Sequence, residues 1–166
     1  MNRFARLLRH WFAMPSRRLF SEDSLARITA AIAEGESRHR GEVCFAVESA
    51  LGARQVLRGV DARARAGEAF AALRVWDTAV NNGVLLYVLL ADHAIEIVAD
   101  RGLSGLVDDA QWRAICARME ERFRGGDHEG AAIAGIEAVS DLLAAHFPQD
   151  GTQPDEDELP NRPHLL

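Results

Sequence analysis

The sequence RVWDTAVNNGVLLYVLLADHAIEIVADRG, residues 74–102, decides the fold. Its longest apolar run, residues 84–90, and a second run, residues 94–99, are separated by the short polar break Ala91-Asp92-His93. Two such runs around a short break predict a β-hairpin. Antiparallel pairing brings the start of the first strand next to the end of the second. We therefore expect the polar residues that flank the hairpin to gather at one end of a sheet: Asp77, Asn81, Asn82, Asp100 and Arg101.

The sequence before the hairpin predicts a parallel neighbour for its first strand. Residues 42–48, EVCFAVE, place apolar side chains on both alternating faces, which is typical of a central strand buried on both sides. Residues 52–74 predict a helical segment with a break near Gly59 and a new N-cap at Asp61. A strand–helix–strand unit makes its two strands parallel, with a right-handed crossover. The predicted fold class is therefore α/β, with a small mixed β-sheet made of a βαβ unit plus an antiparallel hairpin strand.

Three longer helices are predicted to accompany this sheet. Phe20 and Leu25 are spaced to form a hydrophobic staple around the start of the first helix. Residues that commonly begin or end helices mark the bounds: Ser21 at the start of the first, Asp108 or Asp109 and then Gly125-Gly126 around the second, Asp127 and Pro148 around the third. With helices on both faces of the sheet, residues 20–148 are expected to form a compact α/β/α sandwich.

Composition predicts one globular domain in a chain of 166 residues, of which 48% are apolar and 27% charged. No apolar stretch reaches the roughly 18 residues of a transmembrane helix. The net charge of −6 argues against a nucleic-acid partner, which favours a basic surface. Cys44 and Cys116 are expected to be buried free thiols, since they form neither a disulfide framework nor a metal motif. A reducing compartment and a cytoplasmic location follow as expectations.

Residues 1–19 predict a separate, basic, amphipathic helix over residues 3–14, which Pro15 ends. Its apolar face carries Phe4, Leu7, Leu8 and Trp11, and its polar face carries Arg3, Arg6, Arg9 and His10. Such a stripe most often packs on a protein core, either its own domain or a partner subunit, but it also suits a membrane interface. The helix is thus a candidate docking element for a protein partner or a membrane surface, and the second case implies a peripheral membrane location.

Residues 149–166 predict an acidic, proline-rich tail. A segment of this composition cannot bury enough surface to fold alone. It is expected either to be disordered or to act as an arm whose Leu159-Pro160 and Leu165-Leu166 dock on the domain or on a partner. The predicted organisation is therefore a helix at 1–19, an α/β domain at 20–148 and a tail at 149–166.

The polar residues expected at one sheet end form a candidate metal site. Calcium and magnesium prefer oxygen ligands, and the candidates here are Asp77, Asn81, Asn82, Asp100 and Asp108. The same residue types form turns and helix caps without any ligand, so both interpretations stay open. For phosphate chemistry, Asp100 is the candidate nucleophile or metal ligand, and Arg101 is placed to bind a phosphate oxygen.

Four motifs together resemble the TPM domain family, over a region from about Phe20 to Pro148. They are GEVCFAVE (residues 41–48), WDTAVNNGVLLYVLLAD (76–92), VADRGL (98–103) and FRGGDHEGAAIAGIEAV (123–139). The sequences RRLFSEDSLARI near the start and ELPNRP near the end resemble a proteobacterial branch of small, soluble members. The resemblance implies a compact α/β/α sandwich. Many family members carry a signal and a C-terminal membrane helix, and neither is expected here.

The resemblance also implies two kinds of function. Plant members are associated with photosystem II repair and have been proposed to be phosphatases, and some bacterial members resemble calcium binders. This chain has Asp100-Arg101-Gly102 where the family often has a Gly-Tyr-Gly turn, and His128 where the family has an aromatic residue. We therefore expect a TPM-type binding or scaffold module that acts in assembly or maintenance of membrane protein complexes. The alternative is a phosphatase that depends on a divalent metal, Ca²⁺ or Mg²⁺.

Overall fold

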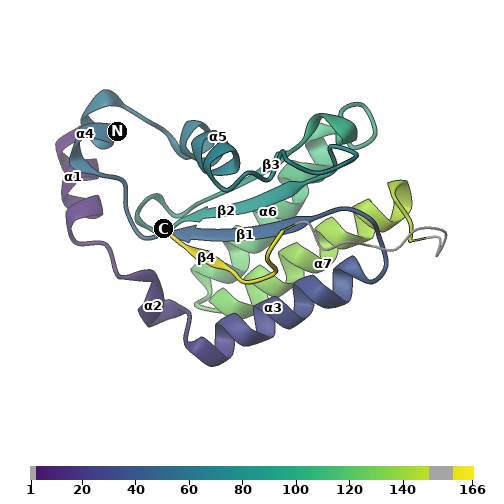
Figure 1. The fold of residues 1–166 in the computed structure, drawn as a ribbon. Helices are drawn as coiled ribbons and strands as arrows, with labels where there is room; N and C mark the ends of the chain where they lie inside the picture. Colours follow the sequence, from purple (N-terminus) through teal and green to yellow (C-terminus); the bar gives the residue numbers. More distant parts are fainter. Residues whose placement is uncertain (1–2, 150–158) are drawn as a thin grey trace.

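The computed structural model describes residues 3–149 and 159–166. Within these residues, helices and strands alternate in the order that the hairpin and the βαβ unit require (Figure 1). The elements are α1 (Arg3–Trp11), α2 (Ser16–Leu19), α3 (Glu22–Glu36), β1 (Val43–Glu48), α4 (Ala53–Arg58), α5 (Ala62–Ala72), β2 (Val84–Leu89), the 3-10 turn η1 (Leu90–Asp92), β3 (Ala94–Ala99), the 3-10 turn η2 (Arg101–Leu103), α6 (Asp109–Arg124), α7 (His128–His146) and β4 (His164–Leu165).

The four strands form one mixed sheet in the order β3-β2-β1-β4. Strands β1 and β2 pair in parallel, with Val43 opposite Val84, and β2 pairs antiparallel to β3, with Val84 opposite Ala99. The hairpin turns through η1 and through His93, whose φ of 52° lies in the left-handed region. This topology confirms the predicted α/β class and the βαβ unit with its antiparallel hairpin strand.

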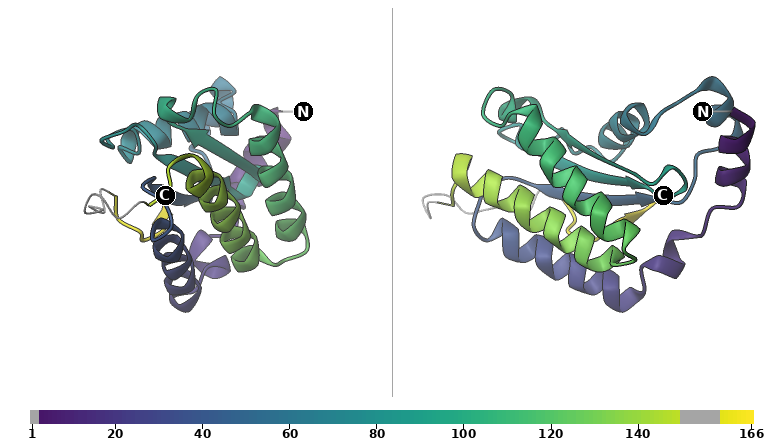
Figure 2. Two further views of the ribbon diagram at one scale, coloured as in Figure 1. Left: turned by 90° about the vertical axis from the view of Figure 1, so that its right-hand side faces the viewer. Right: turned by 180° about the vertical axis from the view of Figure 1, so that it is seen from behind.

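Helices cover both faces of the sheet, which confirms the α/β/α sandwich (Figures 1 and 2). Every residue of β1 and β2 is buried, because each strand has an apolar core on both sides. On one side Phe45 and Leu86 pack with the inner residues of α3, α6 and α7. On the other side Ala46 and Leu85 pack with α4 and α5. Both central strands therefore read as continuous apolar runs in the sequence.

Side-chain caps begin the helices where the sequence predicts them. The side chains of Ser21, Asp61, Asp108 and Asp127 accept hydrogen bonds from backbone N–H groups in the first turns of α3, α5, α6 and α7. Gly35 lies inside α3, next to its last residue. A Cβ at Gly35 would lie 2.2 Å from the Ser140 hydroxyl of α7, so this glycine permits close packing of the two helices.

The end of the tail joins the sheet, which supports the docked interpretation for residues 159–166. His164 and Leu165 pair in parallel with Ala46 and Val47 of β1, and Leu159 is 9% exposed and belongs to the buried cluster that α4 and α5 help to form. Residues 150–158, which carry the predicted acidic stretch, lie outside the described residues. In the part of the chain that is described, no helix is both long and apolar enough to cross a bilayer.

Candidate functional site

The first candidate site lies where β1 and β2 begin and β3 ends. The backbone joins the two flanking loops there, since the N–H of Asp100 donates to the Gly83 carbonyl at 2.9 Å and the N–H of Gly102 donates to the Asn81 carbonyl at 2.9 Å. Gly83 is required at this crossing, because a Cβ would lie 2.0 Å from the Val75 carbonyl oxygen. We call the residues Asp77, Asn81, Asn82, Asp100 and Arg101 the Asp100 end of the sheet.

The side chains of the Asp100 end already interact with neighbouring protein groups. Nε of Arg101 donates to Oδ1 of Asn81 at 3.0 Å, and Asn81 adopts a left-handed φ of 57°. The buried Asn82 side chain donates to the Arg40 carbonyl at 2.6 Å. The guanidinium of Arg74 pairs with the Asp77 carboxylate. The structure thus brings Asn81 and Arg101 into direct contact and gives Asn82 and Asp77 separate partners.

Asp108 has a structural task away from these contacts. Its Oδ1 accepts from the Gln111 N–H at 2.8 Å, and the Gln111 side chain accepts from the Asp108 N–H at 3.1 Å. This capping box satisfies the backbone at the start of α6. Binding of a metal ion by Asp108 would compete with this cap. The role of Asp108 as a metal ligand stays a prediction.

One buried carboxylate oxygen at the Asp100 end has no hydrogen-bond partner. Oδ1 of Asp100 accepts from the Arg101 N–H at 2.7 Å, whereas Oδ2 is buried and has no hydrogen-bond partner. Over residues 3–149 and 159–166, no group of three or more His, Cys, Asp or Glu side chains could hold a metal ion. A Ca²⁺ or Mg²⁺ ion here would need Arg101 and Arg74 to move from the oxygens that they now contact. The predicted metal and catalytic roles of this end therefore remain predictions.

A second feature of the sequence, the spacing Cys-x5-Arg at Cys116 and Arg122, offers no phosphate site. Both residues lie within α6, whose backbone N–H groups are used by the helix itself and do not form a concave anion-binding loop. Burial raises the pKa of the Cys116 thiol to about 11 and that of Cys44 to about 12. Neither thiol is therefore an activated nucleophile.

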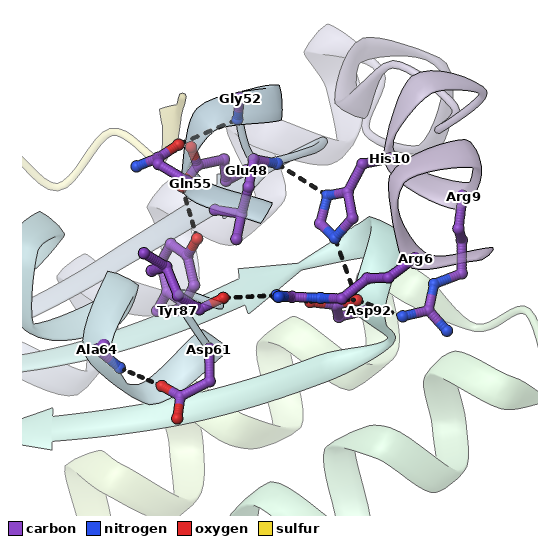
Figure 3. Close-up of polar contacts among 12 residues, drawn as sticks. Arg6, Arg9, His10, Glu48, Gly52, Gln55, Asp61, Ala64, Tyr87 and Asp92 are labelled. Carbon is purple, nitrogen blue, oxygen red and sulfur yellow. Dashed lines mark hydrogen bonds and ion pairs between the residues drawn. The ribbon is translucent and has the colours of Figure 1, made fainter. Parts of the chain in front are cut away.

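At the opposite end of the sheet, α1 is fixed to the domain by ion pairs that no motif in the sequence indicates (Figure 3). The carboxylate of Asp92, in the hairpin turn, accepts from Nη2 of Arg6 at 2.6 Å and from Nε of Arg6 at 3.1 Å. It also accepts from the guanidinium of Arg9 and contacts Nε2 of His10 at 3.1 Å. We call Arg6, Arg9, His10 and Asp92 the Asp92 cluster.

The hydrogen bonds of His10 assign the tautomer of its ring. Nδ1 accepts from the Leu51 N–H at 2.9 Å, so in the neutral ring the proton is on Nε2, which donates to Asp92. Burial lowers the pKa of His10, although the nearby Asp92 carboxylate opposes this effect. Burial also disfavours ionisation of Asp92, but hydrogen bonds from Arg6 and the neighbouring positive charges outweigh it, so the pKa of Asp92 lies below its ordinary value. The cluster is therefore a neutral histidine and two arginines around one carboxylate.

An amphipathic helix usually packs its apolar face on its own domain, whereas α1 packs its arginine side there. The arginine face meets the domain, together with a half-buried Leu7, and the apolar face meets solvent. Phe4 is 66%, Leu8 44% and Trp11 74% exposed, and Phe12 and Met14 after the helix are 78% and 50% exposed. We call these five residues the α1 apolar face. Helical spacing groups Leu7 with Phe4, Leu8 and Trp11, but the structure half-buries Leu7 against the domain and leaves Arg3 exposed. The partner carboxylate of Asp92 determines which side of the helix packs inward.

Comparisons with known proteins agree with this architecture. The chain is similar to the BA42 protein of the psychrophilic bacterium Bizionia argentinensis, solved by NMR, with 28% identity and a TM-score of 0.76 over 89% of this chain and 95% of that one. It also has the fold of the N-terminal domain of a P. gingivalis protein, with 22% identity and a TM-score of 0.63 over 78% of this chain and 79% of that one. No functionally curated protein matches. The profile of the TPM domain matches residues 15–142, and the chain therefore belongs to the TPM domain family.

Proposed function

We propose that this TPM domain is a binding module that docks on an anionic membrane surface through the α1 apolar face. The observation that carries the proposal is the outward orientation of that face, with Trp11 and Phe12 more than 70% exposed. An interfacial helix places its aromatic and aliphatic side chains in the acyl boundary of the bilayer and keeps its basic residues near the head groups.

The charges around α1 favour an anionic surface over a neutral one. Residues 1–20 contain five arginines and no acidic residue. Arg6 and Arg9 contact Asp92, whereas Arg3, Arg17 and Arg18 are exposed. Each basic side chain near an anionic bilayer contributes about 1 kcal/mol to binding. Binding at the membrane would bring the α/β domain close to membrane protein complexes, and a role in their assembly or maintenance follows as part of this proposal.

Co-sedimentation with lipid vesicles tests the proposal. We expect the protein to bind vesicles that contain phosphatidylglycerol more strongly than pure phosphatidylcholine vesicles. The double variant Leu8→Gln/Trp11→Gln should lose at least about tenfold in affinity, because a buried large apolar side chain contributes roughly 1.5 to 3 kcal/mol.

The matched control removes the same residue types elsewhere. Leu57, 56% exposed on α4, and Trp76, 48% exposed beside the Asp100 end, are exposed apolar residues outside α1. The variant Leu57→Gln/Trp76→Gln should bind vesicles like the wild type. Equal losses in both double variants, or no binding of the wild type to anionic vesicles, would contradict a membrane role for α1. Lipid-independent capture of one protein through the same face would identify a protein partner in its place.

The second candidate function is a phosphatase that depends on a divalent metal, and one observation favours it. Oδ2 of Asp100 is buried without a hydrogen-bond partner, and a cation is one group that would satisfy it. Calorimetric titration of Ca²⁺ and Mg²⁺ into metal-free protein should give saturable heat that is lost in Asp100→Asn. The control is Asp141→Asn, since Asp141 pairs with Arg38 on the exposed surface. Absence of heat from both ions would remove this candidate.

A further inference from the structure

A pocket of about 540 Å³ lies beside the hairpin turn, on the side of the sheet that α6 and α7 cover. Val88 at the end of β2 and Ile95 at the start of β3 contribute to its floor. The segment between α1 and α2 forms one wall with Ala13 and Met14, and Phe123 of α6 forms another. Its volume falls in the roughly 300 to 1,000 Å³ range of small-molecule sites.

One side of the pocket is formed by residues at and after the end of α1, the helix that the Asp92 cluster attaches to the domain. Arg9 belongs both to that cluster and to the pocket lining, and Phe12, Ala13 and Met14, which also line the pocket, follow three to five residues later in the chain. The opposite wall is held by aromatic contacts, since the ring centroids of Phe123 and His128 lie 5.2 Å apart and Phe20 stands 6.3 Å from Phe123. The lining is thus built from two separate parts of the fold that meet over the hairpin.

The chemistry of the lining is apolar inside and basic at its margin. Aliphatic, methionine and phenylalanine side chains form most of the surface, whereas Arg9 and Arg124 keep 36% and 67% of their side chains exposed. His93 and His128 also line the pocket, and Glu120 is its acidic residue, 3.8 Å from Arg124. Long arginine side chains lie along apolar surface and direct their guanidinium groups toward water. The Arg9 guanidinium pairs with Asp92, so the more exposed Arg124 is the one that an anion reaches from solvent.

We propose that this pocket binds the acyl chain of an amphiphile whose anionic head group lies against the basic margin. The inference rests on the proposed function, because Phe12 and Met14 belong to both the pocket lining and the α1 apolar face. A chain that leaves the bilayer beneath α1 would therefore pass directly into the pocket. The same chemistry fits a free monoacyl anion, such as a fatty acid, that reaches the pocket from solution.

Titration calorimetry with laurate, below its micelle concentration and without vesicles, tests the pocket on the full chain. We expect saturable binding of laurate and much weaker binding of dodecyltrimethylammonium, which has the same chain length and a positive head group. Ala13→Trp should fill part of the pocket and weaken laurate binding at least about tenfold, as loss of two buried methylene groups would. Arg124→Glu, a change at an exposed side chain that leaves the core untouched, should weaken laurate binding about fivefold or more.

Two matched controls should bind laurate like the wild type. Arg113→Glu reverses an exposed charge on the same helix outside the pocket, and Ala64→Trp adds an indole on α5, on the other face of the sheet. No saturable heat from laurate, equal binding of both head-group charges, or unchanged binding in Ala13→Trp and Arg124→Glu would overturn the proposal. Self-association of the wild type that Ala13→Trp abolishes, without any laurate heat, would also overturn it and assign the pocket to a second copy of this chain.

Vesicle binding by the same variants separates the sources of the chain and the two proposals. Parallel losses of laurate and vesicle binding in Ala13→Trp would identify a bilayer lipid as the source, and loss of laurate binding alone would identify a free monoacyl anion. Laurate binding that persists while the wild type fails to bind anionic vesicles would keep the pocket and refute the membrane-docking function. Vesicle binding without laurate binding would keep the membrane-docking function and refute the acyl-chain pocket.

Discussion

Replacement of Asp92 by alanine should release α1 from the domain without unfolding the domain. Asp92 is the carboxylate that Arg6, Arg9 and His10 all contact, and its side chain is 11% exposed. Without it, the arginine face of α1 packs against a surface that lacks its counter-charge. The helix can then detach, and its arginines become hydrated. Because no unpaired charge stays buried, the core of the domain keeps its stability.

The size of the effect follows from the exposure of each pair. The Arg6 side chain is 12% exposed and donates two bonds to Asp92, and hydrogen bonds to charged groups of this kind contribute about 1.5 to 3 kcal/mol. The Arg9 side chain is 36% exposed, and an ion pair in that environment contributes about 0 to 1 kcal/mol. The free energy of opening α1 should therefore fall by about 1.5 to 4 kcal/mol, a rise of roughly 10- to 700-fold in its opening constant.

Hydrogen exchange followed by mass spectrometry measures this opening. In Asp92→Ala, amides of α1 and the Leu51 N–H, which donates to His10, should exchange faster by that factor, while amides of α7 should keep their protection. The control Asp141→Ala removes an exposed pair with Arg38 and should leave α1 unchanged. Unchanged protection of α1 in Asp92→Ala would show that Asp92 does not hold the helix. An equal loss of protection in α1 and α7 would show that Asp92 supports the whole fold.

Three further predictions concern the stability of the α/β domain and the accessibility of its buried thiol. Burial lowers the pKa of His39 to about 4, below its value of about 6.5 in the unfolded chain, so the unfolded state binds a proton first and the free energy of unfolding falls as pH falls between those values. Urea unfolding should show that the wild type loses about 2 kcal/mol of stability between pH 7.5 and 5. The loss should be smaller in His39→Gln. Gly83→Ala should destabilise by several kcal/mol because its Cβ would meet the Val75 carbonyl, whereas Gly67→Ala, in open space on α5, should stabilise by about 0.4 to 1 kcal/mol. A thiol reagent at pH 8 should label Cys44 only after unfolding, because burial raises the pKa of its thiol to about 12.

Local rules in the sequence account for most of the fold. Ser21, Asp61, Asp108 and Asp127 begin helices because each side chain satisfies backbone groups within its own first turn, and such contacts depend only on neighbouring residues. The hairpin and the βαβ unit follow from the apolar runs and the handedness of crossovers. Strand β4 could not be predicted in this way, because two residues in a proline-rich tail have no periodicity and their partner in β1 is over a hundred residues away.

The candidate sites show the same limit. Register alone brings Asn81, Asp100 and Arg101 to one end of the sheet, but the sequence does not reveal that Arg101 already binds the Asn81 amide. In the hairpin turn, Asp92 has the composition of an ordinary turn residue, and its role appears only when α1 is placed beside it. Amphipathic periodicity determines which residues share a face, whereas the identity of the inward face depends on a contact more than eighty residues away.

The polar attachment of α1 has a consequence for the energetics of membrane binding. A helix that packs its apolar face on its own domain must give up that burial before it enters a bilayer, so docking competes with folding. Here Leu8 and Trp11 face solvent while Arg6 and Asp92 keep the helix on the domain, so binding to a bilayer would bury new apolar surface without breaking an existing contact. Membrane binding should therefore be tighter with α1 attached, because the attached helix is already ordered and the free helix must pay for its own folding on the surface. Asp92→Ala should accordingly weaken vesicle binding although it leaves every residue of the α1 apolar face in place, and stronger vesicle binding by this variant would refute the argument.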